Sequence, residues 1–145
     1  MKNRIKKGHV FRLKDNANCF AEIIAVENSK VTVLAYWHEG NEKIEVNCSD
    51  LEDILLTDSI LNSLGFEQTQ GSLRGLPNEF FWYKCIGGFY LFLVKDNGIY
   101  KIACNKDNAY YGVKFIPLPF LHELQDIIGN IDTKKLFKDV YNDVK

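Results

Sequence analysis

The stretch FFWYKCIGGFYLFLVKDNGIYKIAC, Phe80 to Cys104, decides the fold class of this chain. It contains three runs that are rich in β-branched and aromatic residues and are separated by the turns GG and DNG. Glycine takes positive φ at little cost, so both turns suit tight hairpins. The stretch therefore predicts an antiparallel β-meander over residues 80–104, with strands at 80–86, 89–95 and 99–104.

A second group of short strands is predicted upstream, in residues 1–56. The strand-like runs are HVFRLKD, CFAEIIAVE, KVTVLAYWH, EKIEVN and DLEDILL. So many short strands in so few residues can bury their apolar faces only by curling into a small barrel. The layout resembles an SH3-like β-barrel, with KKGHVFRLKD as its opening strand and SDLEDI as its closing turn and strand. SH3-like folds host nucleic-acid binding, peptide binding and structural roles, so the fold alone selects no function.

The remaining residues, 57–145, are predicted to form an α+β unit around the meander. Thr57 or Asp58 can cap the start of a short helix, and Gly65 can end it. Helices are expected at 58–64, at about 119–130 and at 133–143, and a fourth strand at 110–116. The predicted fold class is therefore α+β, with an SH3-like barrel followed by an antiparallel β-meander that is packed with C-terminal helices.

The helix at 119–130 has one apolar face, which is expected to cover the meander. Its apolar stripe consists of Phe120, Leu121, Leu124, Ile127, Ile128 and Ile131. At about 100° per residue, His122 and Asp126 project to the opposite side, so His122 is expected to be exposed, or to contact the barrel half, a ligand or a partner. His122 and Glu123 begin an H-E-x-x-H zinc signature, but Asp126 stands in place of the second histidine. No metal site is predicted.

The composition is that of a folded protein, because 46% of the 145 residues are hydrophobic, 26% are charged and the formal net charge is -1. The segment before the first acidic residue is basic, with Lys2, Arg4, Lys6, Lys7, Arg12 and Lys14. Such a segment can contact a nucleic acid or a partner, or it can be a solvated surface. No apolar run suits a secretion signal or a membrane span, which predicts a cytoplasmic protein without a membrane role.

The sequence contains no identifiable catalytic constellation, since it lacks a serine or cysteine triad motif and a phosphate-binding glycine loop. The four cysteines, Cys19, Cys48, Cys85 and Cys104, have no C-x-x-C spacing. They are expected to be buried free thiols, with a nucleophile or a disulfide as the alternatives. We therefore predict a protein that is not an enzyme and that has no catalytic residues and no cofactor.

Aromatic residues are dense in the meander, and neighbours along a strand point to opposite faces. Phe81 and Tyr83 are expected on one face, and Phe80 and Trp82 on the other. One face can meet the C-terminal helix. The other needs a cover, which can be the barrel half, a second copy of the chain or a stacked base.

Two motifs together resemble a family of short uncharacterised proteins of gut Bacteroidota and their phages. LTDSILNSLGF is similar to the segment L-T-x-x-I-L-x-x-x-G-F, and FLHELQDII is similar to the helix Y-V-H-x-L-Q-N. The matching residues are Leu56, Thr57, Ile60, Leu61, Gly65, Phe66, His122, Leu124 and Gln125. Leu121 stands where the family often has valine, and Asp126 where it often has asparagine. The resemblance covers residues 8–131 and implies the same order of elements and a phage or mobile-element origin, but no activity.

Two functional hypotheses follow from these observations. The first is a non-enzymatic interaction module that acts through protein contacts or self-association. Its surface would include Trp37, Trp82, Tyr83, His122 and Gln125. The second is a protein that binds a small ligand, a nucleotide or a nucleic acid. In that case aromatic side chains stack on bases, and the phosphates contact Lys6, Lys7 and Arg12.

Overall fold

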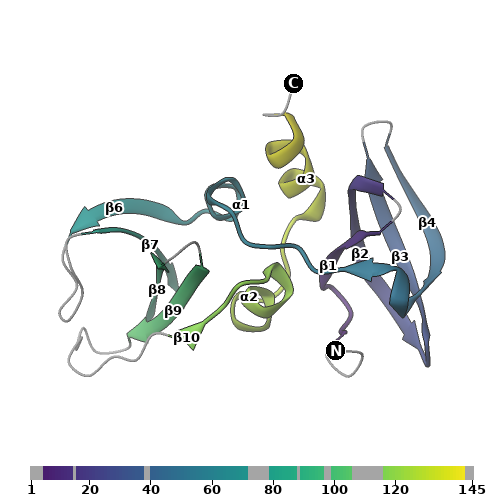
Figure 1. Ribbon diagram of the computed structural model, residues 1–145, viewed down its shortest axis with the longest axis horizontal. Coiled ribbons are helices and arrows are strands. Elements are labelled where there is room, and N and C mark those ends of the chain that lie inside the picture. The colour runs from purple at the N-terminus through teal and green to yellow at the C-terminus, as the bar shows by residue number, and fades with distance from the viewer. Residues whose placement is uncertain are drawn as a thin grey trace. The chain divides into compact units, whose positions relative to one another are not determined.

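The computed structural model describes residues 5–14, 16–37, 40–71, 79–87, 89–96, 99–105 and 116–142 (Figure 1). The chain forms two compact units: unit 1 consists of Met1–Leu55 and Phe120–Lys145, and unit 2 of Leu56–Pro119. The predicted division, which assigned all of 57–145 to one unit, is wrong for the C-terminal helices, because they pack on the N-terminal sheet. Unit 2 is therefore inserted between two parts of unit 1.

Unit 1 contains a five-stranded antiparallel sheet with the strand order β4-β3-β2-β1-β5. Its elements are β1 (Val10–Leu13), β2 (Asn16–Glu27), β3 (Lys30–Trp37), β4 (Gly40–Asn47), the 3-10 turn η2 (Cys48–Asp50) and β5 (Leu51–Glu52). The five predicted strands are present. A closed barrel is not found, because β5 pairs with β1 over two residues and β4 pairs only with β3 in the described part of the chain.

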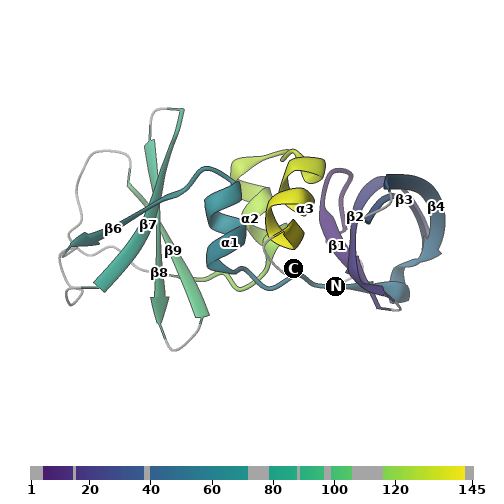
Figure 2. The ribbon, with the colours of Figure 1, turned by 90° about the horizontal axis from the view of Figure 1, so that it is seen from above.

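The sheet of unit 1 curls around a hydrophobic core on its inner face (Figure 2). The buried residues of this core are Phe11, Ala21, Ile23, Val31, Val33 and Cys48. Successive strand residues alternate between the two faces, so Phe20 and Tyr36, which pair across β2 and β3, lie on the outer face. The outer face is the one that a helix can cover.

The two C-terminal helices belong to unit 1. They are α2 (Leu121–Ile128) and α3 (Thr133–Asn142). α3 lies over β2 and β3, where the rings of Phe137 and Tyr141 meet the ring of Phe20 edge to face at 5.7 and 5.2 Å. α2 packs on β1. None of the helices that the structure describes is long and apolar enough to span a membrane.

The buried face of α2 differs from the predicted apolar stripe. Leu121 and Leu124 are fully buried as expected, but Ile127 is 40% exposed, and the polar residues His122 and Gln125 are buried instead. Hydrophobic periodicity counts only apolar side chains, so it cannot register that these two polar residues have partners in β1. As a result, α2 packs on β1 within unit 1.

Unit 2 contains a short helix and a second five-stranded antiparallel sheet with the order β10-β9-β8-β7-β6. Its elements are α1 (Asp58–Ser63), β6 (Glu67–Gly71), β7 (Glu79–Ile86), β8 (Phe89–Asp96), β9 (Ile99–Asn105) and β10 (Ile116–Pro117). Thr57 caps α1 by accepting a hydrogen bond from Ile60 N–H at 3.2 Å, and Gly65 beyond the helix has φ +90°. The predicted helix and meander are confirmed. The predicted strand at 110–116 lies outside the described residues except for Ile116.

One face of the unit 2 sheet contacts a helix, and the other carries a hydrophobic cluster. One face meets α1, because the Tyr100 hydroxyl donates to the Asp58 carboxylate and Lys84 Nζ donates to the Leu64 carbonyl. Burial raises the pKa of Tyr100, and the hydrogen bond and charge of Asp58 raise it further, so the phenol keeps its proton at neutral pH. The opposite face carries a hydrophobic cluster of Phe81, Tyr83, Phe92 and Val94.

Candidate functional site

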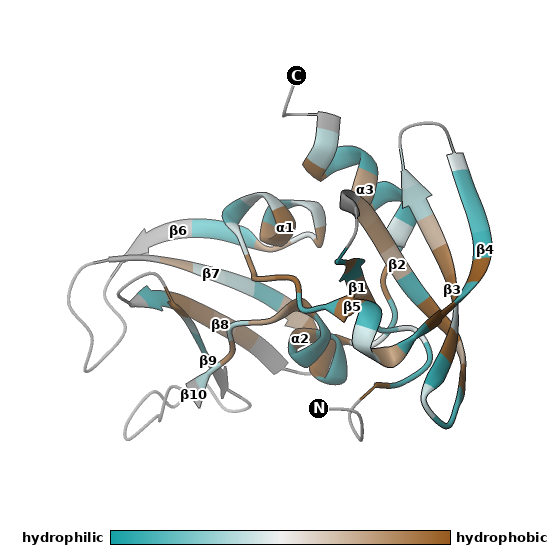
Figure 3. Ribbon diagram, turned by 45° about the vertical axis from the view of Figure 1, so that its right-hand side comes forward, coloured by the Kyte–Doolittle hydropathy of each residue, from teal (hydrophilic) through white to brown (hydrophobic). Residues whose placement is uncertain are grey.

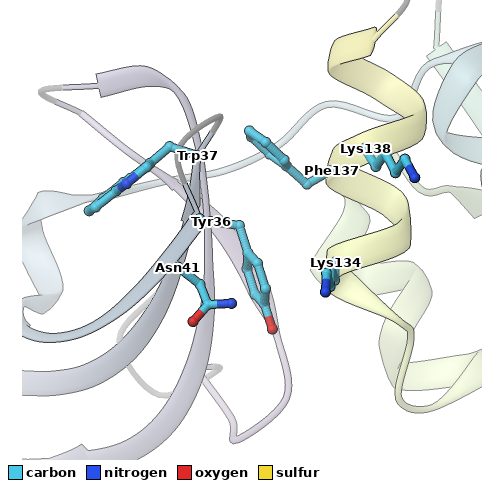
Figure 4. A pocket seen from close by; sticks show the side chains of 7 residues that line it. Tyr36, Trp37, Asn41, Lys134, Phe137 and Lys138 are labelled. Carbon is cyan, nitrogen blue, oxygen red and sulfur yellow. The ribbon is translucent and has the colours of Figure 1, made fainter.

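A pocket of about 200 Å³ opens in unit 1 between the end of the β3–β4 hairpin and α3 (Figure 4). We call it the aromatic–lysine pocket. It is lined by Tyr36, Trp37, Gly40, Asn41, Lys134, Phe137 and Lys138. Sheet and helix therefore each contribute aromatic and polar groups to one concave surface.

Strand alternation and helical spacing bring these residues together. Tyr36 shares the outer face of the sheet with its cross-strand neighbour Phe20, against which Phe137 packs. Lys134 and Lys138 stand four positions apart on α3, so they lie on the same side of the helix. The pocket is thus the place where the packed interface between sheet and α3 opens to solvent.

The rings differ in their direction. In Figure 4 the Phe137 ring is directed from α3 toward the sheet, and the Tyr36 ring lies between the sheet and the helix. The Trp37 ring points away from α3, so Trp37 forms the rim of the pocket. A planar ligand that enters the pocket would contact Tyr36 and Phe137 first.

The charge in the pocket comes from its two lysines. Lys134 and Lys138 are exposed and form no ion pair with another described residue. The Lys138 side chain is directed away from the sheet in Figure 4, but its flexible stem can swing toward a bound anion. The helix side of the pocket therefore offers two cations.

The sheet side of the pocket carries a neutral phenol, that of Tyr36, instead of a cation. Burial raises the pKa of the Tyr36 phenol, and the negative charges of Glu22 and Asp132 raise it further. The phenol is therefore uncharged at neutral pH and can donate or accept a hydrogen bond. Positive charge therefore lies at the lysines, and the negative charges of Glu22 and Asp132 lie near Tyr36.

A polar cluster lies where α2 meets the start of β1. His9 is buried, and its Nε2 lies 2.8 Å from Asp126 Oδ1. The backbone N–H of Lys6 donates to His9 Nδ1 at 3.3 Å, so the proton of the neutral imidazole is on Nε2. Burial acts to raise the pKa of Asp126, but the hydrogen bond from His9 and the charge of Lys6 outweigh it and lower that pKa.

Gln125, a predicted binding residue, joins α2 to β1. Its Oε1 accepts a hydrogen bond from Val10 N–H at 2.8 Å, and its Nε2 donates to the Gly8 carbonyl at 2.7 Å. Both polar ends of the side chain are therefore occupied within unit 1. Gln125 therefore links α2 to the start of unit 1 through these two hydrogen bonds, and both ends of its amide are occupied.

His122 was expected to be exposed, or to make a polar contact to the barrel half, a ligand or a partner. The first alternative is wrong because the residue is only 4% exposed. Its ring stacks between Phe11 and Phe120, with centroid distances of 4.9 and 5.8 Å. Its buried Nδ1 has no hydrogen-bond partner among the described residues, and Asp53 Oδ1 lies 3.7 Å away. Burial lowers the pKa of His122 despite the opposing charges of Asp53 and Glu123. The residue is a neutral aromatic packing element at neutral pH.

The other predicted binding residues are distributed over the two units. Trp37 lies at the aromatic–lysine pocket of unit 1. In unit 2, Trp82 is 2% exposed on the α1 side of the sheet, whereas Tyr83 is half-buried on the opposite side. Trp82 is therefore a core residue of unit 2 in this structure.

The basic residues predicted for phosphate contact do not line the pocket. Lys6 and Lys7 are exposed near the start of unit 1. Arg12 is half-buried, and its guanidinium donates to the Tyr141 hydroxyl at 3.5 Å. The pocket instead uses Lys134 and Lys138, which the sequence prediction missed. Their spacing around an aromatic residue in KKLFK was the available signal.

The cysteines show no shared site. Cys19 and Cys48 are buried free thiols, as predicted. Cys85, at the end of β7, is a free thiol but is exposed, contrary to the prediction. The side chain of Cys104 lies outside the described part. Burial raises the pKa of Cys19, which a hydrogen bond from the Tyr36 backbone only partly opposes, so this thiol is a poor nucleophile. Among the described residues, no three His, Cys, Asp or Glu side chains are grouped as metal ligands.

Comparisons with known proteins add no relative to this geometry: no family model, no curated protein and no solved structure matches the chain.

Proposed function

We propose that this chain is a non-enzymatic binding protein whose unit 1 takes a nucleotide, free or as part of a single strand, in the aromatic–lysine pocket. The observation that carries the proposal is the combination of aromatic rings in one concavity and two exposed lysines on its helix side. Tyr36 supplies half-buried ring surface, Phe137 lines the pocket with a ring that is 7% exposed, and Lys134 and Lys138 supply positive charge. A nucleotide carries both complementary features, a planar base and a phosphate.

The size and polarity of the pocket support a ligand of this class. A volume of about 200 Å³ is below the roughly 300–1,000 Å³ of typical drug-sized sites, so it suits one base or one small ring system and not a large cofactor. The Asn41 side chain at the rim can donate and accept hydrogen bonds. Among the described lining residues, the polar groups are the Tyr36 hydroxyl, the Asn41 amide and the two lysine ammonium groups, which are suited to binding a base or a phosphate.

A second candidate function is a protein–protein interaction, which includes self-association. The observation that favours it is the position of β4, an eight-residue strand at one edge of the unit 1 sheet. Edge strands expose backbone groups that can pair with another chain. Of the described β4 residues only Gly40 and Asn41 line the pocket, so the rest of the strand edge is available for pairing.

The finer description of unit 1 as an SH3-like barrel belongs to the same proposal. Its support is the β1–β4 meander, the 3-10 turn η2 and the return of β5 to β1. The resemblance to proteins of gut Bacteroidota and their phages supports a cytoplasmic role in a phage or mobile-element setting. In such a setting a small binder can sequester a nucleotide signal without any catalytic machinery.

Reversing the charge of both pocket lysines is expected to weaken nucleotide binding at least about tenfold, because each lysine makes a charge-assisted contact worth roughly 1.5–3 kcal/mol. The ligand is first chosen from a panel of mononucleotides and short oligonucleotides by the rise in melting temperature of the full chain. Its Kd is then measured by calorimetry for the wild type and for the Lys134→Glu/Lys138→Glu variant.

The matched control is Lys14→Glu/Lys43→Glu, which makes the same change of net charge at two exposed lysines that do not line the pocket and have no ion pair among the described residues. Its Kd should stay within about twofold of the wild type at physiological salt, where distant surface charges are screened. Equal weakening in both variants would indicate nonspecific attraction and would contradict the pocket. A panel without any thermal shift would also contradict it.

A further inference from the structure

We propose that the free edge of β4 pairs with β4 of a second copy of this chain, so that two unit 1 sheets join in an antiparallel, two-fold symmetric dimer. The proposal develops the protein–protein interaction named above as the second candidate function. It does not depend on the aromatic–lysine pocket.

β4 has the geometry of a strand that can template pairing. Among the described residues it pairs only with β3, and the register of that pairing continues without a bulge from Gly40 to Asn47. Most of its side chains are exposed, and Figure 3 shows the strand as largely hydrophilic. A bulge-free edge strand of this length is the feature through which sheets recruit another chain.

The backbone groups that face the edge can be identified from the register. Cys48 N–H donates to the Ser29 carbonyl at 2.8 Å, in the same register as the β3–β4 pairs. Hydrogen-bonded positions alternate along an antiparallel pair. The even-numbered residues of β4 therefore bond to β3, and Lys43 and Glu45 direct their N–H and C=O groups to the outer edge. Asn47 N–H is already held by the Asp50 carboxylate at 3.0 Å, which ends the free edge there.

The charges on β4 select one register for self-pairing. In one register the two-fold axis passes through Ile44. Lys43 of each copy then stands opposite Glu45 of the other copy, so both of these hydrogen-bonded residue pairs join a positive and a negative charge. When the axis passes through Lys43 or through Glu45, two like charges face each other. The pattern Lys43-Ile44-Glu45 is therefore self-complementary in only one of these three arrangements.

The side chains around the axis are compatible with this register. Ile44 is half-buried and packs against the inner core of unit 1, so the two Ile44 side chains would meet on the core side. Lys43 forms no ion pair with another described residue. Glu45 pairs with Lys30 at 3.9 Å, and both side chains are 61% exposed, so this pair is weak and leaves Glu45 able to bind a second cation.

Pairing of one strand with another buries only a small interface area. The dimer is therefore expected to be weak, with a Kd of roughly micromolar or above. Sedimentation velocity on the full chain, over concentrations up to roughly 1 mM, should show a monomer–dimer equilibrium in the wild type. The single variants Lys43→Glu and Glu45→Lys each place like charges opposite one another twice in a homodimer. Each should be monomeric over the same range.

Mixing the two single variants provides the decisive control. In the mixed dimer, Glu at position 43 of one copy faces Lys at position 45 of the other, and the native Lys43 faces the native Glu45, so dimerisation should return. The double variant Lys43→Glu/Glu45→Lys should dimerise as the wild type does. A variant that merely misfolds could not be rescued by mixing, and circular dichroism of each variant checks its fold.

Amide hydrogen exchange gives an independent readout. The amides of Lys43 and Glu45 should become more protected as the concentration rises, whereas those of Glu42 and Ile44, which bond to β3, should be protected at all concentrations. A wild type that is monomeric throughout, or a dimer that persists in both single variants, overturns the proposal. Either result leaves nucleotide binding by the wild-type pocket unaffected, so failures of the two proposals can be told apart.

Discussion

Replacing Gln125 with leucine is expected to lower the free energy of unfolding of unit 1 by about 2–4 kcal/mol. Leucine has a similar size but neither accepts from Val10 N–H nor donates to the Gly8 carbonyl, which the amide contacts at 2.8 and 2.7 Å. The Val10 N–H is buried, and a buried donor that loses its partner carries a penalty of about 1–3 kcal/mol. Urea denaturation followed by circular dichroism measures the difference.

The matched control is Ile127→Ala on the same helix, where the side chain is 40% exposed. This change removes more apolar atoms but no hydrogen bond, and it should cost less than about 1 kcal/mol. If the two variants had equal stability, the amide of Gln125 would contribute nothing beyond packing. The junction of α2 with β1 would then depend on Leu121 and Leu124 alone.

The stability of unit 1 is expected to fall as the pH is lowered below 6.5, the ordinary pKa of histidine, and His122→Phe should remove most of this fall. Burial lowers the pKa of His122 in the folded chain, so between 6.5 and that lower value the unfolded chain binds a proton that the folded chain does not. The contribution is therefore fully present above pH 6.5 and is lost as the pH falls toward the folded-state pKa. Its slope is at most about 1.4 kcal/mol per pH unit.

Phenylalanine is the informative substitution because the His122 ring already stacks between Phe11 and Phe120. Denaturation of both proteins between about pH 7.5 and 4.5 should give curves that coincide at neutral pH and separate below it. Asp126 gives an internal contrast, since its pKa is lowered from 3.8 and its contribution is lost only at more acidic pH. Parallel curves for wild type and variant would show that His122 does not titrate during unfolding.

Local signals explain the parts of the fold that could be predicted from the sequence. Short apolar runs and glycine turns predict the meander at 80–104. The N-cap residue Thr57 and the helix-ending Gly65 predict α1. Each of these signals acts between residues that are close in the chain. The same is true of the strands in residues 1–56, so their number and their approximate positions could be predicted.

The assignment of the C-terminal helices depended on contacts between distant residues. Gln125 and Val10 are separated by 115 positions, and no periodic pattern indicates which of two sheets a helix will cover. The apolar stripe pointed to the isoleucines, whereas burial is decided by the partners that His122 and Gln125 find in β1. The pocket was missed for the same reason, because Tyr36 and Lys134 become neighbours only after α3 docks.

The insertion of unit 2 into unit 1 sets the order in which the chain can fold during synthesis. Unit 2 is complete once Pro119 has left the ribosome, and the hydrogen bond from Leu56 N–H to the Pro119 carbonyl, at 2.8 Å, then holds its two ends together. Unit 1 must wait for α2 and α3, which are made last. A folded unit 2 replaces a long flexible loop by two adjacent ends, so the loss of entropy on closing unit 1 is smaller. Unit 2 is therefore expected to aid the folding of unit 1, whose two parts flank it in the chain.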